Sequence, residues 1–414
     1  AYFSELSVIW GGKYPTINPE QTLKECKADF ACIGEGLEAF GDFLKALSSN
    51  SDNLYKIPNI WGIKGDTVIK NSIRPLKENL DDLPFVDWSI FDKSQFYKPY
   101  DGNAYKSGDH MLNWGCPYHC TYCINHLYHE MYDNKYHMRR YSVNRIIEEL
   151  KFLVSAYSLE FFKFHDEDFL MRPLANLEEL SNAYRKEINL PFVIETNPKS
   201  VTKEKAALLK NMNCVSASVA IESGDTYMRQ EILGRVDSEE DVISAFGSLN
   251  EVGIRTSSFN MFALPFETRQ SYEKTIALNK KAGVLYPAGC FFYPFEGTKL
   301  REVAIEEGFY DPTDNRQKLY ELRKPALKFK NLSEQELLAM YQSFVLYVKL
   351  PEKYTSYIKR GEKCDDVGEK LRQKIVEIYD KTVWENNGCY IDDGKEAEYL
   401  LELEKLCSDL QDNN

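Results

Sequence analysis

The sequence predicts an α/β fold built on an open, partial barrel of parallel strands, followed by a helical region. Between about residues 108 and 310, short apolar runs alternate six times with helix-like segments, at intervals of about 35 residues. The helix-like segments carry apolar residues at helical spacing. Residues 311–414 keep the helical spacing but show no strand alternation.

The six expected strands are short apolar runs: His110–Trp114, Phe161–Phe164, Phe192–Glu195, Val215–Ile221, Thr256–Leu264 and Gly289–Tyr293. Ser142, Thr202 and Ser238 each precede an amphipathic segment, as helix N-caps do, and Ser238-Glu-Glu-Asp241 has the form of a capping box. Repeated βα units give parallel strands with the helices outside them. Since a closed barrel has eight units, six units predict an open one.

Residues 1–50 have the pattern of the end of a parallel α/β unit. Leu6–Trp10 and Asp29–Ile33 are apolar runs, closed by Gly11-Gly12 and by Gly34-Glu35-Gly36, and a helical pattern follows. Two strands bury too little apolar surface to stand alone, so this unit either packs on the next domain or follows further strands. Four prolines interrupt residues 51–105, which we expect to be a linker between this unit and a barrel at 106–310.

Composition narrows the class of protein. The formal net charge is −13, and an acidic surface repels phosphate backbones, which makes nucleic acid a poor partner. No apolar run approaches the roughly 18–20 residues of a membrane-spanning helix, and the first residues lack the basic and apolar regions of a signal peptide. The ten cysteines of such a chain indicate a reduced, cytoplasmic protein, where clustered thiols bind metal more often than they form disulfides.

Three of the ten cysteines, Cys116, Cys120 and Cys123, lie within eight residues. They follow an expected strand, on the face where parallel barrels place their active sites. Thiolates suit both iron–sulfur clusters and zinc. Three thiolates can ligate three corners of a [4Fe–4S] cluster and leave the fourth iron open. The alternative is a zinc site completed by a histidine, although zinc cysteines usually come as two C-x-x-C pairs. The candidate histidines are His119, His126 and His129.

The spacing C-x-x-x-C-x-aromatic-C, with Tyr122 as the aromatic residue, resembles the signature of the radical S-adenosylmethionine superfamily. The resemblance implies a partial (β/α)₆ TIM-like barrel with a [4Fe–4S] cluster on the three cysteines. It also implies that the amino and carboxylate groups of S-adenosylmethionine bind the open iron. An external donor such as flavodoxin or ferredoxin would supply the electron that splits the cofactor into methionine and a 5′-deoxyadenosyl radical.

Two expected strand ends resemble cofactor-binding elements of this family. In the first, Asp168, and less clearly Asp166, is placed to meet the methionine ammonium; these carboxylates could equally cap the next helix. In the second, Glu222-Ser223-Gly224 resembles the family's "IESG" element, in which a carboxylate accepts hydrogen bonds from ribose hydroxyls. Gly224 would permit the tight turn that follows the strand.

Two further stretches carry the same resemblance. Arg235 is similar to a family arginine near the methionine carboxylate, where a planar guanidinium offers a bidentate match; the alternative is a solvated helix residue. The stretch 263–268 resembles the adenine-side "GLPGET" loop, which makes Pro265 a cofactor-binding residue. Ala263 and Phe266 replace its two glycines.

The segments before the barrel resemble the last third of a Rossmann-like cobalamin-binding domain. Gly11, Gly12 and Glu35 are its candidate cofactor residues, and residues 80–84 resemble the "LDxLP" bridge to the radical barrel. The family's cobalt-ligating motif D-x-H-x-x-G is absent from the 414 residues. We therefore expect either a fragment or a degenerate domain, and weak or no cobalamin binding.

Reactions of this subfamily include methyl transfer, ring formation and rearrangement, on a small-molecule or peptide substrate. Three alternatives remain open. One is a radical enzyme that does not bind cobalamin, and another is a methylthiotransferase, which is disfavoured because no second three-cysteine group precedes Cys116. The third is a non-catalytic iron–sulfur carrier or zinc-stabilised binding protein, which would not need so long a βα region.

Overall fold

The computed structural model describes residues 6–49, 52–314 and 324–408. The chain divides into two compact units that each combine separate stretches of sequence. The first unit consists of residues 1–80, 115–138 and 295–301, and the second of residues 81–114, 139–294 and 302–414. The three clustered cysteines thus belong to the same unit as the N-terminal segment.

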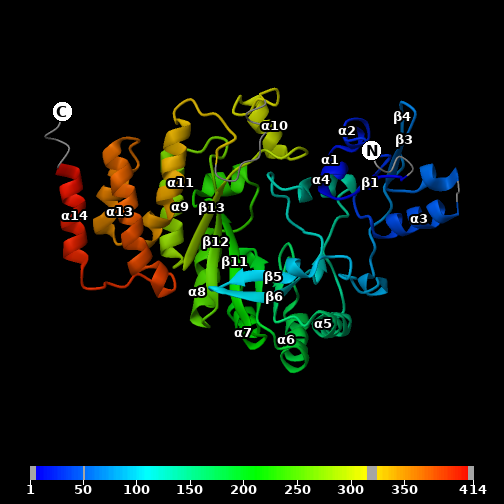
Figure 1. The fold of residues 1–414 in the computed structure, drawn as a ribbon, viewed down its shortest axis with the longest axis horizontal. Helices are drawn as coiled ribbons and strands as arrows, with labels where there is room; N and C mark the ends of the chain where they lie inside the picture. The colour runs from blue at the N-terminus through cyan, green and yellow to red at the C-terminus, as the bar shows by residue number, and fades with distance from the viewer. Residues whose placement is uncertain (1–5, 50–51, 315–323, 409–414) are drawn as a thin grey trace. The chain divides into compact units, whose positions relative to one another are not determined.

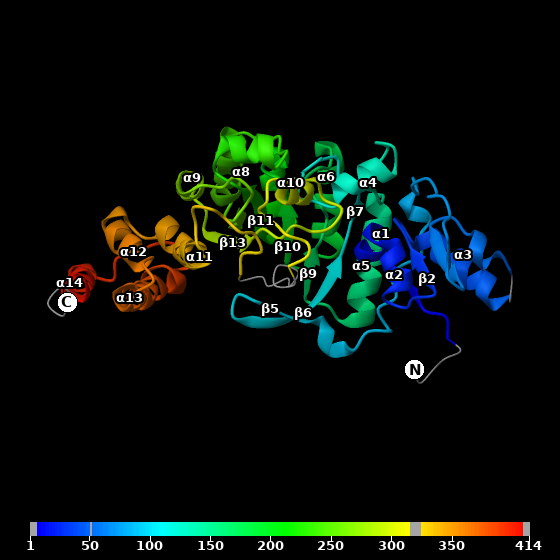
Figure 2. The same ribbon diagram turned by 90° about the horizontal axis from the view of Figure 1, so that it is seen from above.

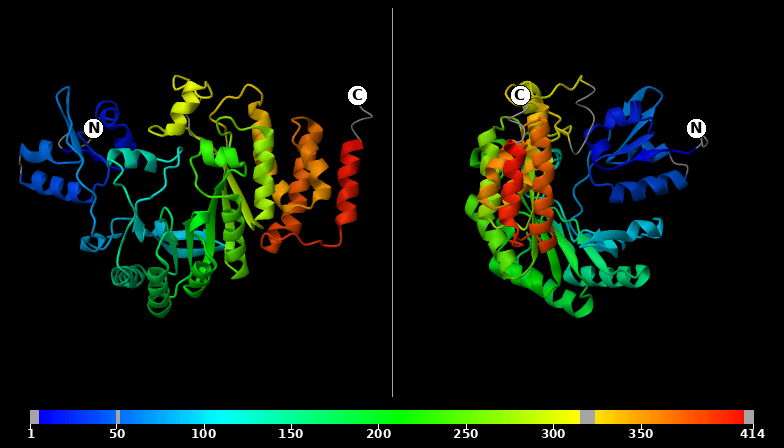
Figure 3. Two further views of the ribbon diagram at one scale, coloured as in Figure 1. Left: turned by 180° about the vertical axis from the view of Figure 1, so that it is seen from behind. Right: turned by 60° about the vertical axis from the view of Figure 1, so that its left-hand side comes forward.

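In the described part of the second unit, seven strands form one curled sheet in the order β13-β12-β11-β10-β9-β6-β5 (Figure 3). Six of them run parallel and β5 pairs antiparallel with β6. The predicted open barrel of six parallel strands is confirmed, but the predicted position of its first strand, residues 110–114, is wrong. The parallel strand ends at His110, and residues 113–114 pair antiparallel with residues 139–140 in a separate ribbon. The strands are β5 (Tyr97–Tyr100), β6 (Asn103–His110), β9 (Phe161–Phe164), β10 (Phe192–Thr196), β11 (Cys214–Glu222), β12 (Arg255–Phe262) and β13 (Tyr286–Phe291).

Helices cover one face of this sheet (Figure 1). Three of them begin where the N-cap pattern predicts: the Ser142 and Thr202 side chains accept backbone N–H groups, and Ser238 and Asp241 form a complete capping box. On β9, Phe162 is buried while the side chain of Lys163 is 42% exposed, which follows from alternation along a strand. The helices are α5 (Val143–Tyr157), α6 (Leu174–Glu187), α7 (Lys203–Asn211), α8 (Glu239–Glu251) and α9 (Arg269–Lys281).

The C-terminal region is helical, as predicted, in the residues that the structure describes. It packs against α9 and β13 through an apolar cluster that contains Phe262, Tyr272 and Phe344 (Figure 1). The Tyr272 hydroxyl donates to the Met340 carbonyl at 2.6 Å. The helices are α10 (Lys299–Glu306), α11 (Glu334–Lys349), α12 (Thr355–Gly361), α13 (Asp366–Thr382) and α14 (Glu396–Ser408).

The first unit contains a small sheet in the order β1-β2-β3-β4, formed by β1 (Ile9–Trp10), β2 (Phe30–Cys32), β3 (Ile60–Lys64) and β4 (Thr67–Ile69). The expectation that the segment after residue 50 is only a linker is therefore wrong for residues 60–69, which extend the sheet by an antiparallel hairpin. A two-residue turn, Gly65-Asp66, joins the hairpin strands, with Gly65 at φ +61°. That glycine–aspartate turn is the sequence signal that could have revealed it.

Helices lie on both faces of this small sheet (Figure 2). Ala39 and Phe43 of α3 (Leu37–Ser48) pack with Phe30 and Ile60 of the strands. On the other face are α1 (Lys13–Ile17) and α2 (Pro19–Lys24). The same unit holds α4 (Asn125–Met131), which follows the cysteines. In the second unit, β7 (Asn113–Trp114) and β8 (Arg139–Arg140) pair as a two-stranded ribbon. In the sequence, these strands stand directly before and after residues 115–138, which carry the cysteines and belong to the first unit.

Within the described residues, no helix is both long enough and apolar enough to span a membrane.

Candidate functional site

The three clustered cysteines lie in the loop between β7 and α4. Cys116 is buried, and Cys120 and Cys123 are partly exposed. At the start of the loop, the backbone of Gly115 packs closely against that of His137: Gly115 has φ +92°, and a Cβ there would overlap the His137 carbonyl oxygen. The Cys123 N–H donates to the Cys120 carbonyl at 3.1 Å. Tyr122 is partly buried in the same turn.

The geometry bears on the two metals that the sequence allows. Zinc needs its ligands to converge on one point, and among the described residues no three His, Cys, Asp or Glu side chains converge in that way. The rings of His119 and His129 stack instead, 3.9 Å apart. In a cubane cluster each thiolate binds a different iron, so the sulfurs remain apart. Three cysteines on one loop fit the donor set of a [4Fe–4S] cluster with one open iron.

The two glycine turns of the small sheet lie together. Because β1 and β2 are parallel neighbours, their carboxyl ends share one edge. The Thr16 hydroxyl links them, donating to the Gly12 carbonyl at 2.7 Å and accepting from the Gly34 N–H at 3.0 Å. The Glu35 N–H donates to the Tyr132 hydroxyl, just after α4, at 3.2 Å. Gly12 has φ +103°, which only glycine adopts readily; Gly11 precedes it and both are exposed.

The acidic residues after β9 have structural partners. Asp168 is fully buried and accepts from the Thr196 and Ser200 hydroxyls at 2.6 and 2.5 Å. Burial raises its pKa, although these hydrogen bonds lower it. Asp166 is also buried and accepts from the Leu112 N–H at 3.1 Å; burial raises its pKa to about 6. Between them Glu167 is exposed. The motif itself contained Glu167, but alternation alone could not show which carboxylate points outward.

The end of β11 is a tight turn. Glu222 is 8% exposed and has φ +64°, an unusual conformation for a residue with a side chain. Ser223 is fully buried. Gly224 is needed for space rather than for its dihedral angle, because a Cβ would lie 2.5 Å from the Cα of Thr275 and closer still to the Lys274 carbonyl oxygen. The predicted turn is present, and the requirement for glycine comes from packing against α9.

Arg235 lies at the same strand end and is only 6% exposed, so the alternative of a solvated helix arginine is wrong. Its Nη2 donates to the Ala220 carbonyl at 2.9 Å and its Nε to Asp237 Oδ1 at 2.9 Å. Its Nη1 lies 3.8 Å from Glu222 Oε1. The structure therefore brings two predicted cofactor residues, Glu222 and Arg235, into one charged group.

The loop after β12 keeps a glycine-like backbone without glycine. Ala263 and Phe266 have φ +57° and +65°, and Pro265 between them is buried. Glu267 closes the loop: its Oε2 accepts from the Ala263 N–H at 2.6 Å, and its Oε1 is buried without a hydrogen-bond partner. Burial raises the pKa of Glu267 to about 8. No role was assigned to Glu267 from the sequence.

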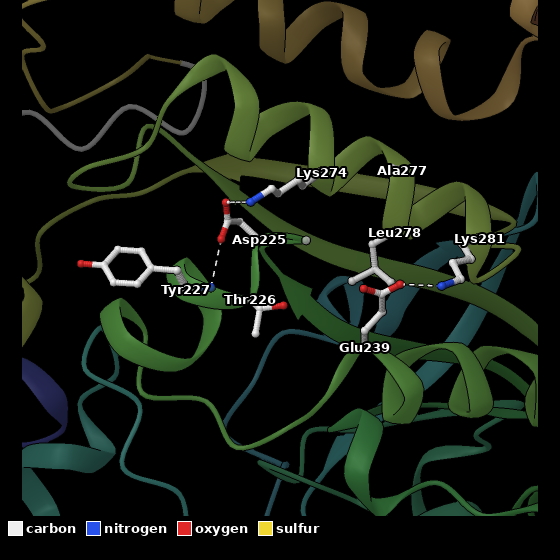
Figure 4. A pocket seen from close by; sticks show the side chains of 9 residues that line it. Asp225, Thr226, Tyr227, Glu239, Lys274, Ala277, Leu278 and Lys281 are labelled. Carbon is white, nitrogen blue, oxygen red and sulfur yellow. Dashed lines mark hydrogen bonds and ion pairs between the residues drawn. The ribbon is translucent and has the colours of Figure 1, made fainter.

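A pocket of about 410 Å³ lies behind Gly224, between α9 and the start of α8 (Figure 4). Its charged side chains pair with one another: Lys274 with Asp225 at 2.8 Å, and Lys281 with Glu239 at 2.7 Å. It lies among the helices and contains neither Glu222 nor Arg235, so it is separate from the predicted cofactor residues.

A curled half-barrel of parallel strands, together with a loop of three cysteines, defines an α/β protein with a candidate iron–sulfur site. The family model described as the Radical SAM superfamily matches residues 114–278. This segment, from β7 to α9, therefore belongs to the radical S-adenosylmethionine superfamily, whose members bind a [4Fe–4S] cluster and S-adenosylmethionine.

Two solved structures and one curated protein are similar over more of the chain. An uncharacterized methyltransferase of Pyrococcus horikoshii is 25% identical over 83% of this chain and 73% of its own length. The radical S-adenosylmethionine methyltransferase TsrM of Kitasatospora setae matches 74% of this chain and 60% of its own, with TM-score 0.57 and 15% identity. The cobalamin-dependent radical enzyme OxsB matches 98% of this chain and 68% of its own, with TM-score 0.62 and 13% identity. At these identities the two structures establish a shared fold.

Proposed function

We propose that this protein is a radical enzyme that binds a [4Fe–4S] cluster on Cys116, Cys120 and Cys123 and cleaves S-adenosylmethionine reductively. The observation that carries the proposal is the loop of three cysteines, C-x-x-x-C-x-x-C, at the start of a matched radical S-adenosylmethionine segment. The cofactors supply the radical chemistry. The protein's own residues hold the cluster, bind the cofactor and position the substrate.

The polar groups at the strand ends support cofactor binding. Glu222 is the candidate acceptor for ribose hydroxyls, with Ser223 in the same turn, while Pro265 lies in the loop proposed for the adenine side. Glu167, the exposed carboxylate after β9, is a second candidate for the methionine ammonium beside Asp168, which the Thr196 and Ser200 hydroxyls engage.

We further propose that the reaction is of the cobalamin-dependent type, with methyl transfer as the first reaction to test. The support is the fold shared with TsrM and OxsB, together with the methyltransferase description of the Pyrococcus protein. Gly11, Gly12 and Glu35 are the candidate cobalamin residues of this chain. The substrate is a small molecule or a peptide, and a flavodoxin or ferredoxin is the proposed electron donor.

The test is anaerobic reconstitution with iron and sulfide. We expect about four irons per chain, and 5′-deoxyadenosine after reduction in the presence of S-adenosylmethionine. Replacing any of the three cysteines by alanine should remove the cluster absorption. Cys364→Ala is the matched control, because Cys364 is an exposed free thiol on the C-terminal region. Stoichiometric zinc without iron would contradict the proposal. A cluster whose electron paramagnetic resonance signal ignores S-adenosylmethionine would favour an electron carrier.

A further inference from the structure

A buried ionic network lies behind the end of β11. Asp237 and Arg229 are fully buried, and Arg235 is nearly so. Asp237 contacts both arginines: its Oδ1 accepts from Arg235 Nε at 2.9 Å, its backbone carbonyl accepts from Arg229 Nε at 3.2 Å, and its Oδ2 forms an ion pair with the same Nε at 3.3 Å. One carboxylate thus bridges two guanidinium groups in a place that water does not reach.

Each arginine extends from this bridge to the strand end that carries the proposed cofactor residues. Arg235 reaches the Ala220 carbonyl and approaches Glu222. Arg229 Nη1 donates to the Ser223 carbonyl at 2.8 Å. The two guanidinium groups therefore hold the backbone on both sides of Glu222.

This support matters because the turn is strained. Glu222 has φ +64°, a conformation that costs on the order of 1–3 kcal/mol for a residue with a side chain and persists only where the surroundings enforce it. The Ser223 N–H donates to the Ile221 carbonyl at 2.8 Å, which closes the turn over a single residue. The arginine contacts to Ala220 and Ser223 are the enforcing contacts on either side.

The charges explain why the network needs Asp237. Arg229, Arg235, Glu222 and Asp237 together carry two positive and two negative charges. Without Asp237, two buried guanidinium groups would share one carboxylate, and an unpaired buried charge is strongly unfavourable. Arg235 would then reorient toward solvent or toward Glu222, and either change would move the Glu222 carboxylate.

We infer that Asp237 is a positioning residue of the cofactor site, which sets the affinity for S-adenosylmethionine by fixing Arg229 and Arg235 and, through them, Glu222. The inference rests on the proposed function. Asp237 is fully buried, so its effect passes through the two arginines. Arg235 acts in part as the link between Asp237 and Glu222, since its Nε donates to Asp237 and its Nη2 to the Ala220 carbonyl.

The experiment measures equilibrium binding of S-adenosylmethionine to reconstituted, unreduced protein, so no turnover is needed. Asp237→Asn keeps the shape and removes the charge. We expect about a tenfold or greater loss of affinity, with the iron content unchanged. Asp241→Asn is the matched control: it weakens the capping box of α8, where Asp241 accepts from the Ser238 N–H at 2.8 Å, but does not contact the network. Its affinity for S-adenosylmethionine should equal that of the wild type.

A double-mutant cycle separates positioning from a general loss of structure. If Asp237 acts through Glu222, the double variant Asp237→Asn/Glu222→Gln should lose less affinity for S-adenosylmethionine than the product of the losses in the two single variants. Unchanged affinity in Asp237→Asn, or fully multiplicative effects, would overturn the inference. Should Asp237→Asn fail to fold, Arg229→Lys replaces it: this change keeps the charge but loses the bond to the Ser223 carbonyl, and wild-type affinity in that variant would equally overturn it. A wild-type protein that binds no S-adenosylmethionine would instead refute the proposed function.

Discussion

Replacing Glu267 by glutamine tests whether a buried, protonated carboxyl group closes the loop after β12. Glu267 is 5% exposed, and its neighbours within hydrogen-bond distance are the backbone N–H groups of Ala263 and Leu264. Burial raises its pKa from 4.5 to about 8, against the smaller opposite effect of these two bonds. The folded protein therefore holds this proton at neutral pH, while the unfolded chain releases it.

The sign and the size of the effect follow from this difference. Because the pKa is higher in the folded state, the stabilisation is complete below about pH 4.5 and is lost as the pH rises toward about 8. Each pH unit of this interval corresponds to about 1.4 kcal/mol, so the loss is on the order of 5 kcal/mol at most. Glutamine accepts the same two N–H groups and does not ionise. It should cost about 1–2 kcal/mol at acidic pH, where its amide N–H₂ replaces the unpartnered oxygen.

The assay compares denaturant unfolding of the wild type and Glu267→Gln at about pH 5, 7 and 9. We expect the wild type to lose stability relative to the variant as the pH rises, so that the two curves converge or cross. Glu178→Gln, on the exposed face of α6, should follow the wild type at every pH. If the wild type and Glu267→Gln change in parallel from acidic to alkaline pH, Glu267 does not hold a proton in the folded state and the reasoning is wrong.

Three further predictions concern the strand ends and the small sheet. Gly224→Ala should destabilise the protein by about 3 kcal/mol, because its Cβ would overlap α9. The control, Gly247→Ala, places its Cβ in open space on α8 and should be neutral or stabilise by up to about 1 kcal/mol. Equal unfolding midpoints for the two variants would contradict the packing argument. Asp168→Asn should lower the free energy of unfolding by about 1–3 kcal/mol, whereas Glu167→Gln should weaken S-adenosylmethionine binding at wild-type stability. Weaker binding in Asp168→Asn with wild-type binding in Glu167→Gln would instead make Asp168 the cofactor-binding residue. Cobalamin should bind these 414 residues weakly and reversibly, because they contain no D-x-H-x-x-G motif to ligate cobalt. The methyl-transfer assay therefore needs cobalamin in the reaction mixture, and little hydroxocobalamin should remain after desalting, read by corrin absorption; firm retention would mean that the glycine turns suffice.

The barrel could be predicted because its signals are local. Alternating apolar runs located five of the six parallel strands, and Ser238 with Asp241 marked the start of α8 three residues apart. The first strand, β6, was misplaced because its residues are mostly polar. The hairpin at residues 60–69 was missed because β4 has only three residues and none of them is buried. Its signal was confined to the two-residue turn at Gly65, which prolines on either side obscured.

The candidate site was predictable only in part, for a physical reason. The cysteine spacing and the Glu222 turn are contiguous in sequence, and a family resemblance could find them. Asp237 and Arg229 are eight positions apart and read as ordinary surface charges, because nothing in the sequence shows that both are buried. A buried carboxylate that forms ion pairs with two arginines is a property of the folded chain, and the same holds for the proton on Glu267.

The two adjacent strand ends of the half-barrel share one construction. After β11 the positive φ falls on Glu222, and after β12 it falls on Ala263; neither residue is glycine. In each case a buried carboxyl group secures the turn, Asp237 through two arginines and Glu267 directly through backbone N–H groups. A glycine would adopt these angles without strain but would leave the turn free to change shape. Side chains at these positions, held by buried acids, give a more rigid edge, which is what a site needs if it must bind a cofactor in one orientation. The two acids differ in charge, since Asp237 balances arginines while Glu267 keeps its proton. Alkaline pH should therefore loosen the loop after β12 while the turn after β11 keeps its shape.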